Sequence, residues 1–201
     1  MRKFSSVLLS LVTIVAATLG AVVATGGAAQ AVTSCSTKFP NADPVSGYYY
    51  NRGPYWWANK NASPGSTRMV LDVQGPWTDN GTKVHLWHWY GGDSQYWCLA
   101  PQGYQVNGAN VYKFRNLYTG KCLDIAGPSA ADGTNVHQWG CTEFDDYRSQ
   151  QWAQFSANGG YQFRNVYSGT CLDVRNWGNT DGAELQIWTC GDTSKANQIF
   201  F

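Results

Sequence analysis

Three aspartates and three tryptophans recur in this sequence at one fixed separation. Each aspartate lies between two aliphatic residues and is followed 15 positions later by a tryptophan, in the pairs Asp72 and Trp87, Asp124 and Trp139, and Asp173 and Trp188. A carboxylate accepts strong hydrogen bonds from hydroxyl groups, and the face of an indole ring packs against C–H groups. Together these side chains could bind a neutral, hydroxylated ligand such as a sugar ring.

The residues around each pair indicate that both side chains lie on the non-core face of short strands. Successive side chains of a strand point to opposite faces, so Leu185 and Ile187 would enter the core while Gln186 and Trp188 face away. The other two copies alternate in the same way, with Val84, Leu86 and Val136 directed inward and His85, Trp87, His137 and Trp139 directed outward. In the second copy Gln138 takes an inward position, which weakens the pattern there.

A turn separates the two members of each pair. The dipeptides Asn80-Gly81, Asp132-Gly133 and Asp181-Gly182 are typical of tight turns, so a strand, a turn and a returning strand would bring each aspartate to its tryptophan. Two structural alternatives remain open: the tryptophan is covered by a neighbouring loop, or the aspartate bonds its own local backbone. A tryptophan that faces outward at the same place three times favours a ligand.

The pairs belong to an internal triplication. Equivalent aspartates are 52 and 49 residues apart (72 to 124, and 124 to 173), and two of the copies carry cysteines 19 residues apart (122 to 141, and 171 to 190). Because all six cysteines follow a predicted export signal, disulfides are expected. The repeat and the even cysteine count predict the pairs Cys122 with Cys141, Cys171 with Cys190, and Cys35 with Cys98.

The first 31 residues have the pattern of a secretory signal peptide. A basic start at Arg2 and Lys3 precedes an apolar stretch, and Ala29-Gln30-Ala31 matches a small-x-small cleavage site. A membrane anchor is the alternative, but no later apolar run is long enough to span a bilayer. Residues 32–46 contain two prolines and show no period, so we expect an extension or linker there.

The composition of the remaining 170 residues (201 less 31) narrows the classes of partner. Without Arg2 and Lys3, 12 of the 14 basic side chains remain against 13 acidic ones, a net charge of −1. A nucleic-acid partner would require a basic face, so none is expected, and neither is membrane insertion. His85, His88 and His137 do not form a metal-binding constellation, and no catalytic nucleophile, phosphate loop or cofactor fingerprint is present, so no metal or cofactor is expected.

The chain from Gly47 onward predicts an all-β fold. Short β-rich runs alternate with turn residues, and no segment sustains a helical period. Each copy ends with a glutamine two residues before a large aromatic residue, in Gln95-Tyr96-Trp97, Gln150-Gln151-Trp152 and Gln198-Ile199-Phe200. These three aromatic residues are expected to meet in a shared core around a threefold axis.

Taken together, these motifs resemble the repeats of ricin-type lectins. The resemblance rests on the Leu-Asp-aliphatic triplets, the cysteine spacing and the glutamine–aromatic endings, and it covers residues 47–201. It implies a β-trefoil of three four-stranded lobes, at about 47–101, 102–153 and 154–201. The sequence looks most like secreted bacterial versions that bind galactose-containing glycans or plant polysaccharides and are often appended to glycosidases.

The resemblance also implies which residues bind the sugar. In the third lobe Asp173 would accept sugar hydroxyls, Trp188 would stack on the ring and Asn197 would donate to a hydroxyl, with Gln186 and Gln198 completing the site. The other sites would use Asp124, His137, Trp139 and Ser149, and Asp72, His85, Trp87 and Ser94. Since serine replaces the asparagine in these two lobes, and the first also lacks a disulfide, we rank the third lobe first and the first lobe last. Trp77 and Trp177 either wall their sites or pack against their lobes.

The sequence thus predicts a secreted, non-catalytic carbohydrate-binding protein with up to three shallow sites. The alternatives are a lectin subunit that targets a separate enzyme or toxin, a trefoil protease inhibitor, and a small glycosidase. A glycosidase needs two carboxyl groups about 5 to 9 Å apart. The two glutamates after residue 31, Glu143 and Glu184, stand in non-equivalent places, and the repeated aspartates would lie one per lobe. The residue types do not rank galactose, xylose and arabinose as ligands.

Overall fold

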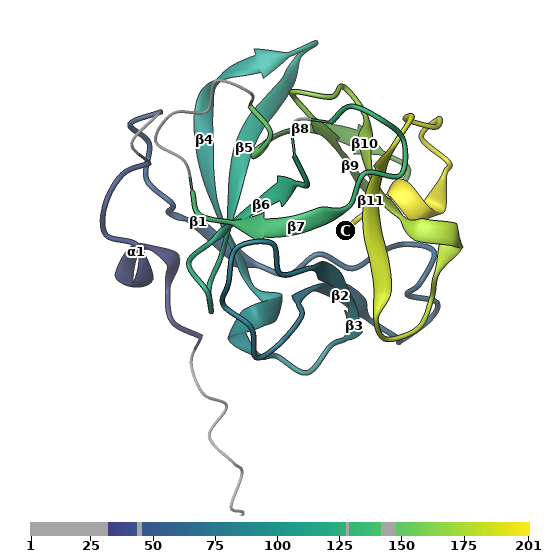
Figure 1. The fold of residues 1–201 in the computed structure, drawn as a ribbon, viewed down its shortest axis with the longest axis horizontal. Helices are drawn as coiled ribbons and strands as arrows, with labels where there is room; N and C mark the ends of the chain where they lie inside the picture. The colour runs from purple at the N-terminus through teal and green to yellow at the C-terminus, as the bar shows by residue number, and fades with distance from the viewer. Residues whose placement is uncertain (1–31, 44–45, 128, 142–147) are drawn as a thin grey trace, which may run out of the picture. The chain divides into compact units, whose positions relative to one another are not determined.

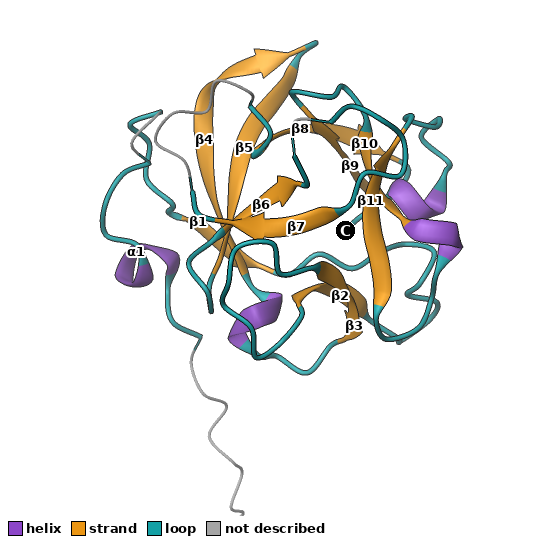
Figure 2. Cartoon of the chain, viewed as in Figure 1, coloured by secondary structure: helices purple, strands orange, loops and turns teal. Residues whose placement is uncertain are grey.

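The computed structural model describes residues 32–43, 46–127, 129–141 and 148–201; the predicted signal peptide, residues 1–31, lies outside the described residues. The described part is built mainly of strands, as Figure 2 shows, which confirms the predicted all-β class. Its elements, in chain order, are α1 (Cys35–Lys38), β1 (Arg52–Tyr55), β2 (Met69–Val73), β3 (Val84–His88), the 3-10 helix η1 (Asp93–Gln95), β4 (Trp97–Val106), β5 (Ala109–Asn116), β6 (Cys122–Ile125), β7 (Val136–Trp139), β8 (Gln151–Ala157), β9 (Gly160–Asn165), β10 (Cys171–Val174), the 3-10 helix η2 (Arg175–Trp177), β11 (Ala183–Trp188) and the 3-10 helix η3 (Ala196–Gln198).

Three hairpins with one register confirm the predicted strand–turn–strand units. They are β2–β3, β6–β7 and β10–β11 (Figure 1). The aspartate of each hairpin lies directly opposite a polar residue of the returning strand, in the pairs Asp72 and His85, Asp124 and His137, and Asp173 and Gln186. The turn glycines Gly81, Gly133 and Gly182 have φ of 84°, 88° and 83°, a region that glycine adopts without steric cost.

The hairpins are connected by longer antiparallel strands. The main path through the sheet is β1-β4-β5-β8-β9-β10-β11-β3-β2, with β6 paired to β5 and β7 to β6 (Figure 1). Neighbouring hairpins also pair with one another, through Lys83 with His137, Asn135 with Gln186, and Glu184 with His85. This cyclic pairing of three equivalent hairpins is the three-lobed arrangement expected of a β-trefoil.

The three repeated aromatic residues lie in the shared core, as predicted. Trp97, Trp152 and Phe200 are fully buried in one hydrophobic cluster. The indole Nε1 of Trp97 donates to the carbonyl of Leu71 (3.2 Å), and that of Trp152 donates to the carbonyl of Leu123 (3.1 Å). These bonds connect the core to the residues that precede Asp72 and Asp124. Phe200 has no N–H group with which to make the equivalent bond in the third lobe.

The strand alternation is confirmed in all three hairpins. The inward aliphatic side chains are at most 1% exposed, namely Val84, Leu86, Val136, Leu185 and Ile187. Gln138 also lies inward and is fully buried, and its amide donates to the backbone carbonyls of Trp77 and Asp79. The amide nitrogen of Gln138 therefore has partners, whereas its buried Oε1 receives no hydrogen bond from the described residues.

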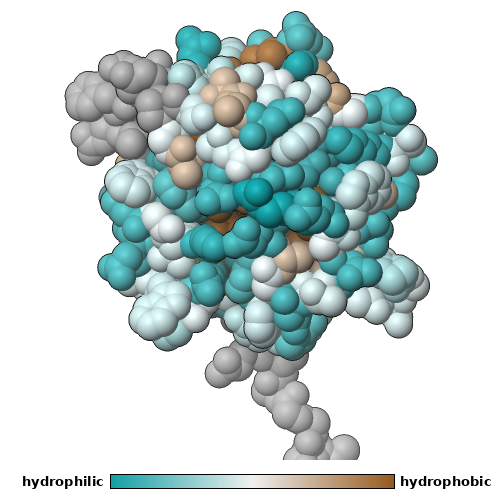
Figure 3. Space-filling view, turned by 45° about the vertical axis from the view of Figure 1, so that its right-hand side comes forward, coloured by the Kyte–Doolittle hydropathy of each residue, from teal (hydrophilic) through white to brown (hydrophobic). Residues whose placement is uncertain are grey.

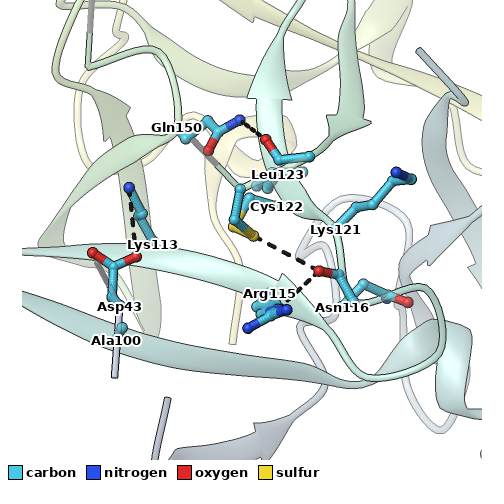
Figure 4. The surroundings of a disulfide bond; sticks show 12 residues. Asp43, Ala100, Lys113, Arg115, Asn116, Lys121, Cys122, Leu123 and Gln150 are labelled. Carbon is cyan, nitrogen blue, oxygen red and sulfur yellow. Dashed lines mark hydrogen bonds and ion pairs between the residues drawn. A yellow bond between two sulfur atoms is a disulfide. The ribbon is translucent and has the colours of Figure 1, made fainter. Parts of the chain in front are cut away.

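The N-terminal segment is fastened to the lobes by covalent and polar contacts. All three predicted disulfides are present: Cys35–Cys98, Cys122–Cys141 and Cys171–Cys190. Close to the second of them, the buried Asp43 carboxylate lies 3.5 Å from the buried Lys113 ammonium group of β5 (Figure 4) and accepts a hydrogen bond from the Tyr50 hydroxyl (2.7 Å). Burial alone would raise the pKa of Asp43, but Tyr50, Ser46 and Lys113 outweigh it and lower that pKa.

Within the described residues, no helix is both long and apolar enough to cross a membrane.

Candidate ligand-binding sites on the three hairpins

The third-lobe site is a hollow of about 210 Å³ over hairpin β10–β11. At its floor Asp173, only 2% exposed, receives three amide donors at 2.9 Å: Gln186 Nε2 on Oδ1, and Asn197 Nδ2 and Gln198 Nε2 on Oδ2. At its rim Trp188 is 39% exposed. The structure therefore brings together all five residues that the resemblance implied for this lobe.

Asn197 and Gln198 have their amide donors engaged within the protein. Asn197 Nδ2 donates to Asp173 and to the Val174 carbonyl. The Asp173 carboxylate accepts three bonds, only one of them on Oδ1, and so retains an acceptor position for a ligand hydroxyl. Gln198 is fully buried, and it also donates to the Thr189 carbonyl and accepts from Gly191 N. Gln198 therefore positions Asp173 and is not in reach of a ligand.

Two acceptors remain available at the third-lobe floor. Gln186 Oε1 and Asn197 Oδ1 are buried and receive no hydrogen bond from the described residues. Both residues line the hollow, together with Asp173 and Trp188. A buried carbonyl oxygen without a donor is unusual, so a ligand hydroxyl would satisfy a need that the protein leaves open.

The first-lobe site is a hollow of about 350 Å³ lined by Asp72, Gln74, Gly75, His85, Trp87 and Tyr90. Asp72 Oδ2 accepts from Gln95 Nε2 (3.3 Å), whereas the buried Asp72 Oδ1 has no donor among the described residues. The rings of His85 and Trp87 are stacked, with centroids 5.3 Å apart and an angle of 23° between their planes. In this lobe the acceptor without a donor is therefore an oxygen of the aspartate itself, and it lies beside the stacked rings of His85 and Trp87.

Burial sets the protonation of the first-lobe site. It raises the pKa of Asp72 above the ordinary value of 3.8, and the polar side chains of Ser94 and Gln95 oppose this only in part. It also lowers the pKa of His85 below 6.5, with an opposing contribution from Asp181. At neutral pH the imidazole is therefore uncharged, which suits a ring stacked on an indole.

The second-lobe site has the same plan. Asp124 Oδ2 accepts from Gln150 Nε2 (3.1 Å), and the buried Asp124 Oδ1 has no donor among the described residues. His137 stacks on Trp139 at 5.4 Å and 27°, and Trp139 is 41% exposed. Burial lowers the pKa of His137, although Asp124 opposes the shift.

The two serines do not repeat the role of Asn197. No hydrogen bond joins the Ser149 side chain to Asp124 within the described residues, and residues 142–147, which include Glu143, lie outside them. In the first lobe the Ser94 hydroxyl bonds the Tyr90 hydroxyl at 2.7 Å, and its hydrogen bond to Asp72 opposes the rise that burial causes in the pKa of that carboxyl. Because serine is shorter than asparagine, it cannot span to the carboxylate and the following carbonyl at once.

Three bridging glutamines, Gln95, Gln150 and Gln198, form a shared feature that the sequence reasoning missed in two lobes. All are fully buried. Each donates both to the site aspartate and to the carbonyl of the residue that follows the site tryptophan: His88 (2.8 Å), Gly140 (2.9 Å) and Thr189 (3.1 Å). Their invariant place, two residues before the core aromatic, was the available signal. They connect the floor of each site to its rim.

The turn of each hairpin holds the next hairpin. Three clasp residues, Asn80, Asp132 and Asp181, accept a hydrogen bond from the backbone N–H of Gly140 (2.9 Å), Thr189 (2.5 Å) and His88 (2.7 Å), respectively. Each of these N–H groups belongs to the residue directly after a site tryptophan. The tryptophan of each lobe is therefore positioned by the turn of another lobe.

The two additional tryptophans behave differently. Trp177, in η2 with a φ of 56°, lines the third-lobe hollow together with Asn176 and Lys195. Trp77 is 56% exposed and does not line the first-lobe hollow, where Tyr90 stands instead. Asn176, Lys195 and Tyr90 were not anticipated, because they lie in loops that the repeat does not align.

The face drawn in Figure 3 is mostly hydrophilic, with small, separated apolar spots. Within the described residues no group of three or more His, Cys, Asp or Glu side chains is arranged to hold a metal ion.

A shared aromatic core and three hairpins, each with an aspartate below a tryptophan, define a β-trefoil of the lectin type. The chain matches the model of the ricin-type beta-trefoil lectin domain-like family over residues 50–139 and, in overlap, 93–188. It belongs to this family, whose fold suggests carbohydrate binding. No curated protein sequence matches the chain.

Solved structures of similar fold include designed and natural proteins. The designed threefold-symmetric protein ThreeFoil is 28% identical, with a TM-score of 0.61 over 73% of this chain and 94% of that one. An exo-beta-1,3-galactanase from Clostridium thermocellum is 29% identical (TM-score 0.60), but the match spans 73% of this chain and only 29% of the enzyme chain. The ricin B-like lectin of Macrolepiota procera, solved with lactose, is 18% identical (TM-score 0.52; 74% and 94% of the chains) and supports the fold alone.

Proposed function

We propose that this protein is an exported, non-catalytic lectin that binds neutral, galactose-containing or plant-type glycans through its three hairpin sites. The observation that carries the proposal is the repeated pairing of a rim tryptophan with buried acceptors that lack donors. These acceptors are Asp72 Oδ1, Asp124 Oδ1, Gln186 Oε1 and Asn197 Oδ1. A sugar ring offers a C–H face for the indole and hydroxyl donors for these oxygens.

Export is supported by the three disulfides, which persist in oxidising compartments. The predicted signal peptide at residues 1–31 belongs to the same proposal. Mass spectrometry of protein from the culture medium should find Val32 at the N-terminus. A mature protein that retains residues 1–31 would contradict it.

The environment of Glu184 supports a non-catalytic role. Its carboxylate is bonded by Lys83 and lies 3.3 Å from Arg175 Nε. The hydrogen bond from Lys83 outweighs the opposing effect of burial, so the pKa of Glu184 is lowered. A glycosidase needs a carboxylic acid with a raised pKa to protonate the leaving group, so Glu184 is poorly suited to that role. Release of reducing sugar from a polysaccharide by the purified protein would overturn this part of the proposal.

A glycan array followed by calorimetric titration tests the sugar specificity. Beta-1,3-galactan is the first probe, because a galactanase is among the similar structures. Trp188→Ala should weaken binding to the third lobe by about tenfold, since it removes the stacking surface. Trp77→Ala is the matched control, because this exposed tryptophan does not line the first-lobe hollow. Equal losses in both variants, or no loss in either, would refute the site assignment.

A second candidate function is that of a targeting subunit for a separate enzyme. It is favoured by the galactanase match, in which the similar part makes up 29% of a larger enzyme chain. Affinity capture from the producing culture with the purified lectin, compared with a sample blocked by its sugar, would show whether an enzyme associates with it.

A further inference from the structure

A second concave surface lies away from the three hairpins, along strands β1, β4, β5, β8 and β9. It consists of two adjoining hollows of about 600 and 370 Å³, which we call the mouth groove. The two hollows share Arg52, Asn110 and Tyr112. Their volumes fall in the range of about 300 to 1,000 Å³ that is usual for small-molecule sites.

The walls of the mouth groove continue the core faces of their strands. Tyr112 lies two residues from the core ring Phe114, Gln154 two residues from Trp152, and Tyr161 two residues from Phe163, so each shares a strand face with its core neighbour. Tyr55, Tyr112 and Tyr161 hold equivalent positions in the three repeats, since each stands two residues before a core aromatic ring. The groove therefore draws on all three lobes at one place, whereas each hairpin site belongs mainly to one lobe.

The floor of the groove holds a donor without a partner. Trp57 lines the larger hollow, is 7% exposed and packs edge-on against Tyr161, with ring centroids 5.9 Å apart. Its indole Nε1 is buried and has no acceptor within the described part of the chain. Because buried N–H groups are nearly always hydrogen-bonded, an oxygen atom of a bound ligand would complete this one.

Arg52 gives the groove its charge. Its Nη1 donates to the Tyr112 hydroxyl (3.1 Å), and its guanidinium carbon lies 5.5 Å from the centre of that ring. This contact orients the guanidinium and leaves most of its five donors free. Arg52 is exposed, and no carboxylate of the described residues forms an ion pair with it.

The lining of the mouth groove has a cationic side chain and no acidic one. No aspartate or glutamate lines either hollow, whereas every hairpin site has an aspartate at its floor. A free guanidinium binds a carboxylate with two parallel hydrogen bonds. Tyrosine rings and the side chains of Asn110, Gln154 and Ser156 suit sugar rings and their hydroxyls.

We infer that the mouth groove binds an acidic oligosaccharide segment, with the carboxylate of a uronic acid residue on Arg52. The choice of a saccharide rests partly on the proposed lectin function, because a polysaccharide with neutral and acidic segments would then engage both surfaces of one molecule. Two-point attachment of this kind raises avidity without new contacts.

Titration with three probes tests the inference: oligogalacturonate, its methyl ester and a neutral galacto-oligosaccharide. The ester retains the sugar ring and removes the negative charge. Wild-type protein should bind oligogalacturonate but not the ester at this surface. Arg52→Gln should weaken oligogalacturonate binding by about tenfold to a hundredfold, as expected for loss of a charged hydrogen bond.

Further variants separate this groove from the hairpin sites. Gln154→Glu, which adds a carboxylate to the groove wall, should also abolish oligogalacturonate binding, and Gln154→Lys should restore it in the Arg52→Gln background. Arg68→Gln is the charge-matched control, since Arg68 bonds local carbonyls in another loop. Trp188→Ala should leave oligogalacturonate binding unchanged. Thermal melts of every variant establish that the fold is intact.

Several results would overturn the inference. The first is equal binding of the acid and the ester. The second is loss of acid binding in Trp188→Ala or Lys195→Gln but not in Arg52→Gln. The third is Arg52-dependent binding of a peptide with a free C-terminal carboxylate in place of the saccharide. If neutral glycans bind nowhere while oligogalacturonate still depends on Arg52, the proposed hairpin function fails and this inference stands.

Discussion

At the scale of single residues, the site aspartates are defined by the donors around them. In the third lobe three amides donate to the carboxylate, and the acceptors without any donor are the amide oxygens of Gln186 and Asn197. In the other two lobes histidine and serine replace those amides, so one carboxylate oxygen stays open. Two chemical versions of one site therefore coexist in a single chain, which favours different hydroxyl patterns in different lobes.

Gln198→Ala tests the positioning role of the bridging glutamines. The variant removes two donors and one acceptor from a buried site, so we expect a loss of about 1 to 3 kcal/mol in the free energy of unfolding. Sugar affinity of the third lobe should fall as well, because Asp173 loses one of its three donors. Urea denaturation and calorimetric titration measure the two effects. Gln105→Ala, at an exposed glutamine bonded to Asn110, is the control and should change neither.

The raised pKa of Asp72 predicts that ionisation of this carboxyl lowers the stability of the fold but strengthens sugar binding. The folded state holds this proton more tightly than the unfolded state, so the contribution of Asp72 to stability is full below pH 3.8 and is lost as pH rises through its raised pKa. Asp72→Asn should therefore gain stability over wild type at pH 7, and the gain should shrink as the solution is acidified.

Acidification, which increases the contribution of Asp72 to stability, should decrease the sugar affinity of the first lobe. In a Trp139→Ala/Trp188→Ala background only that lobe keeps its tryptophan, and its binding should weaken on acidification as Asp72 takes up a proton. Urea denaturation and titrations across the pH range give both curves. A stability difference between Asp72→Asn and wild type that does not change with pH would contradict this account.

At the scale of the elements, the clasp residues make each hairpin depend on another. Asp132, in the turn of β6–β7, accepts from both the backbone N–H and the hydroxyl of Thr189, directly after Trp188. The glycine beside it is also close to this site, since a β-carbon on Gly133 would come within 3.9 Å of both Trp188 and Gln186.

Asp132→Ala should weaken binding by the third lobe, although the residue belongs to the second. We expect a loss of about 0.5 to 1.5 kcal/mol in unfolding free energy, because the bonds lie at the surface. Titration of single-site backgrounds, in which two of the three site tryptophans are replaced, measures each lobe separately. Asp192→Ala is the control: within the described residues, the side chain of this third-lobe aspartate bonds only the nearby Ser194. A larger effect on the second lobe than on the third would refute the clasp.

The hairpins show what the sequence could and could not predict. Alternation, turn dipeptides and spacing were sufficient to predict the hairpins, the outward face of Asp173 and Gln186, and the pairs Cys122–Cys141 and Cys171–Cys190, because these contacts are local within one repeat. The Cys35–Cys98 pair followed only from the even cysteine count. Two of the three donors on Asp173 come from η3, 24 and 25 residues further on, and their direction depends on packing. The clasps and the mouth groove join different lobes, so no pattern within a repeat could reveal them.

At the scale of the whole molecule, the N-terminal segment is fastened away from the hollows of the first and third lobes. It is fastened through Cys35–Cys98, which spans 63 residues, and through the buried pair of Asp43 and Lys113. None of these four residues lines a hairpin hollow.

Replacing Cys35 and Cys98 by serine should lower the free energy of unfolding by about 4 kcal/mol, as the chain-entropy relation gives for a loop of that length. Sugar binding by the hairpins should be unchanged.

Opening Cys171–Cys190, which spans 19 residues, should cost about 3 kcal/mol by the same relation and should also impair the third lobe. Chemical denaturation of both variants, with sugar titrations, makes the comparison. A change in hairpin affinity in the first variant would show that the segment supports the sites.

The clasps have an evolutionary consequence. One repeat of the sequence does not contain one complete binding site, because each site is completed by the turn of a different repeat. A mutation in one copy would therefore alter the specificity of another. A single copy in isolation would carry an unfinished surface, and moving one copy into a new protein would transplant only part of its preference. Selection for sugar specificity in such a chain therefore acts on the contacts between repeats as well as on each repeat.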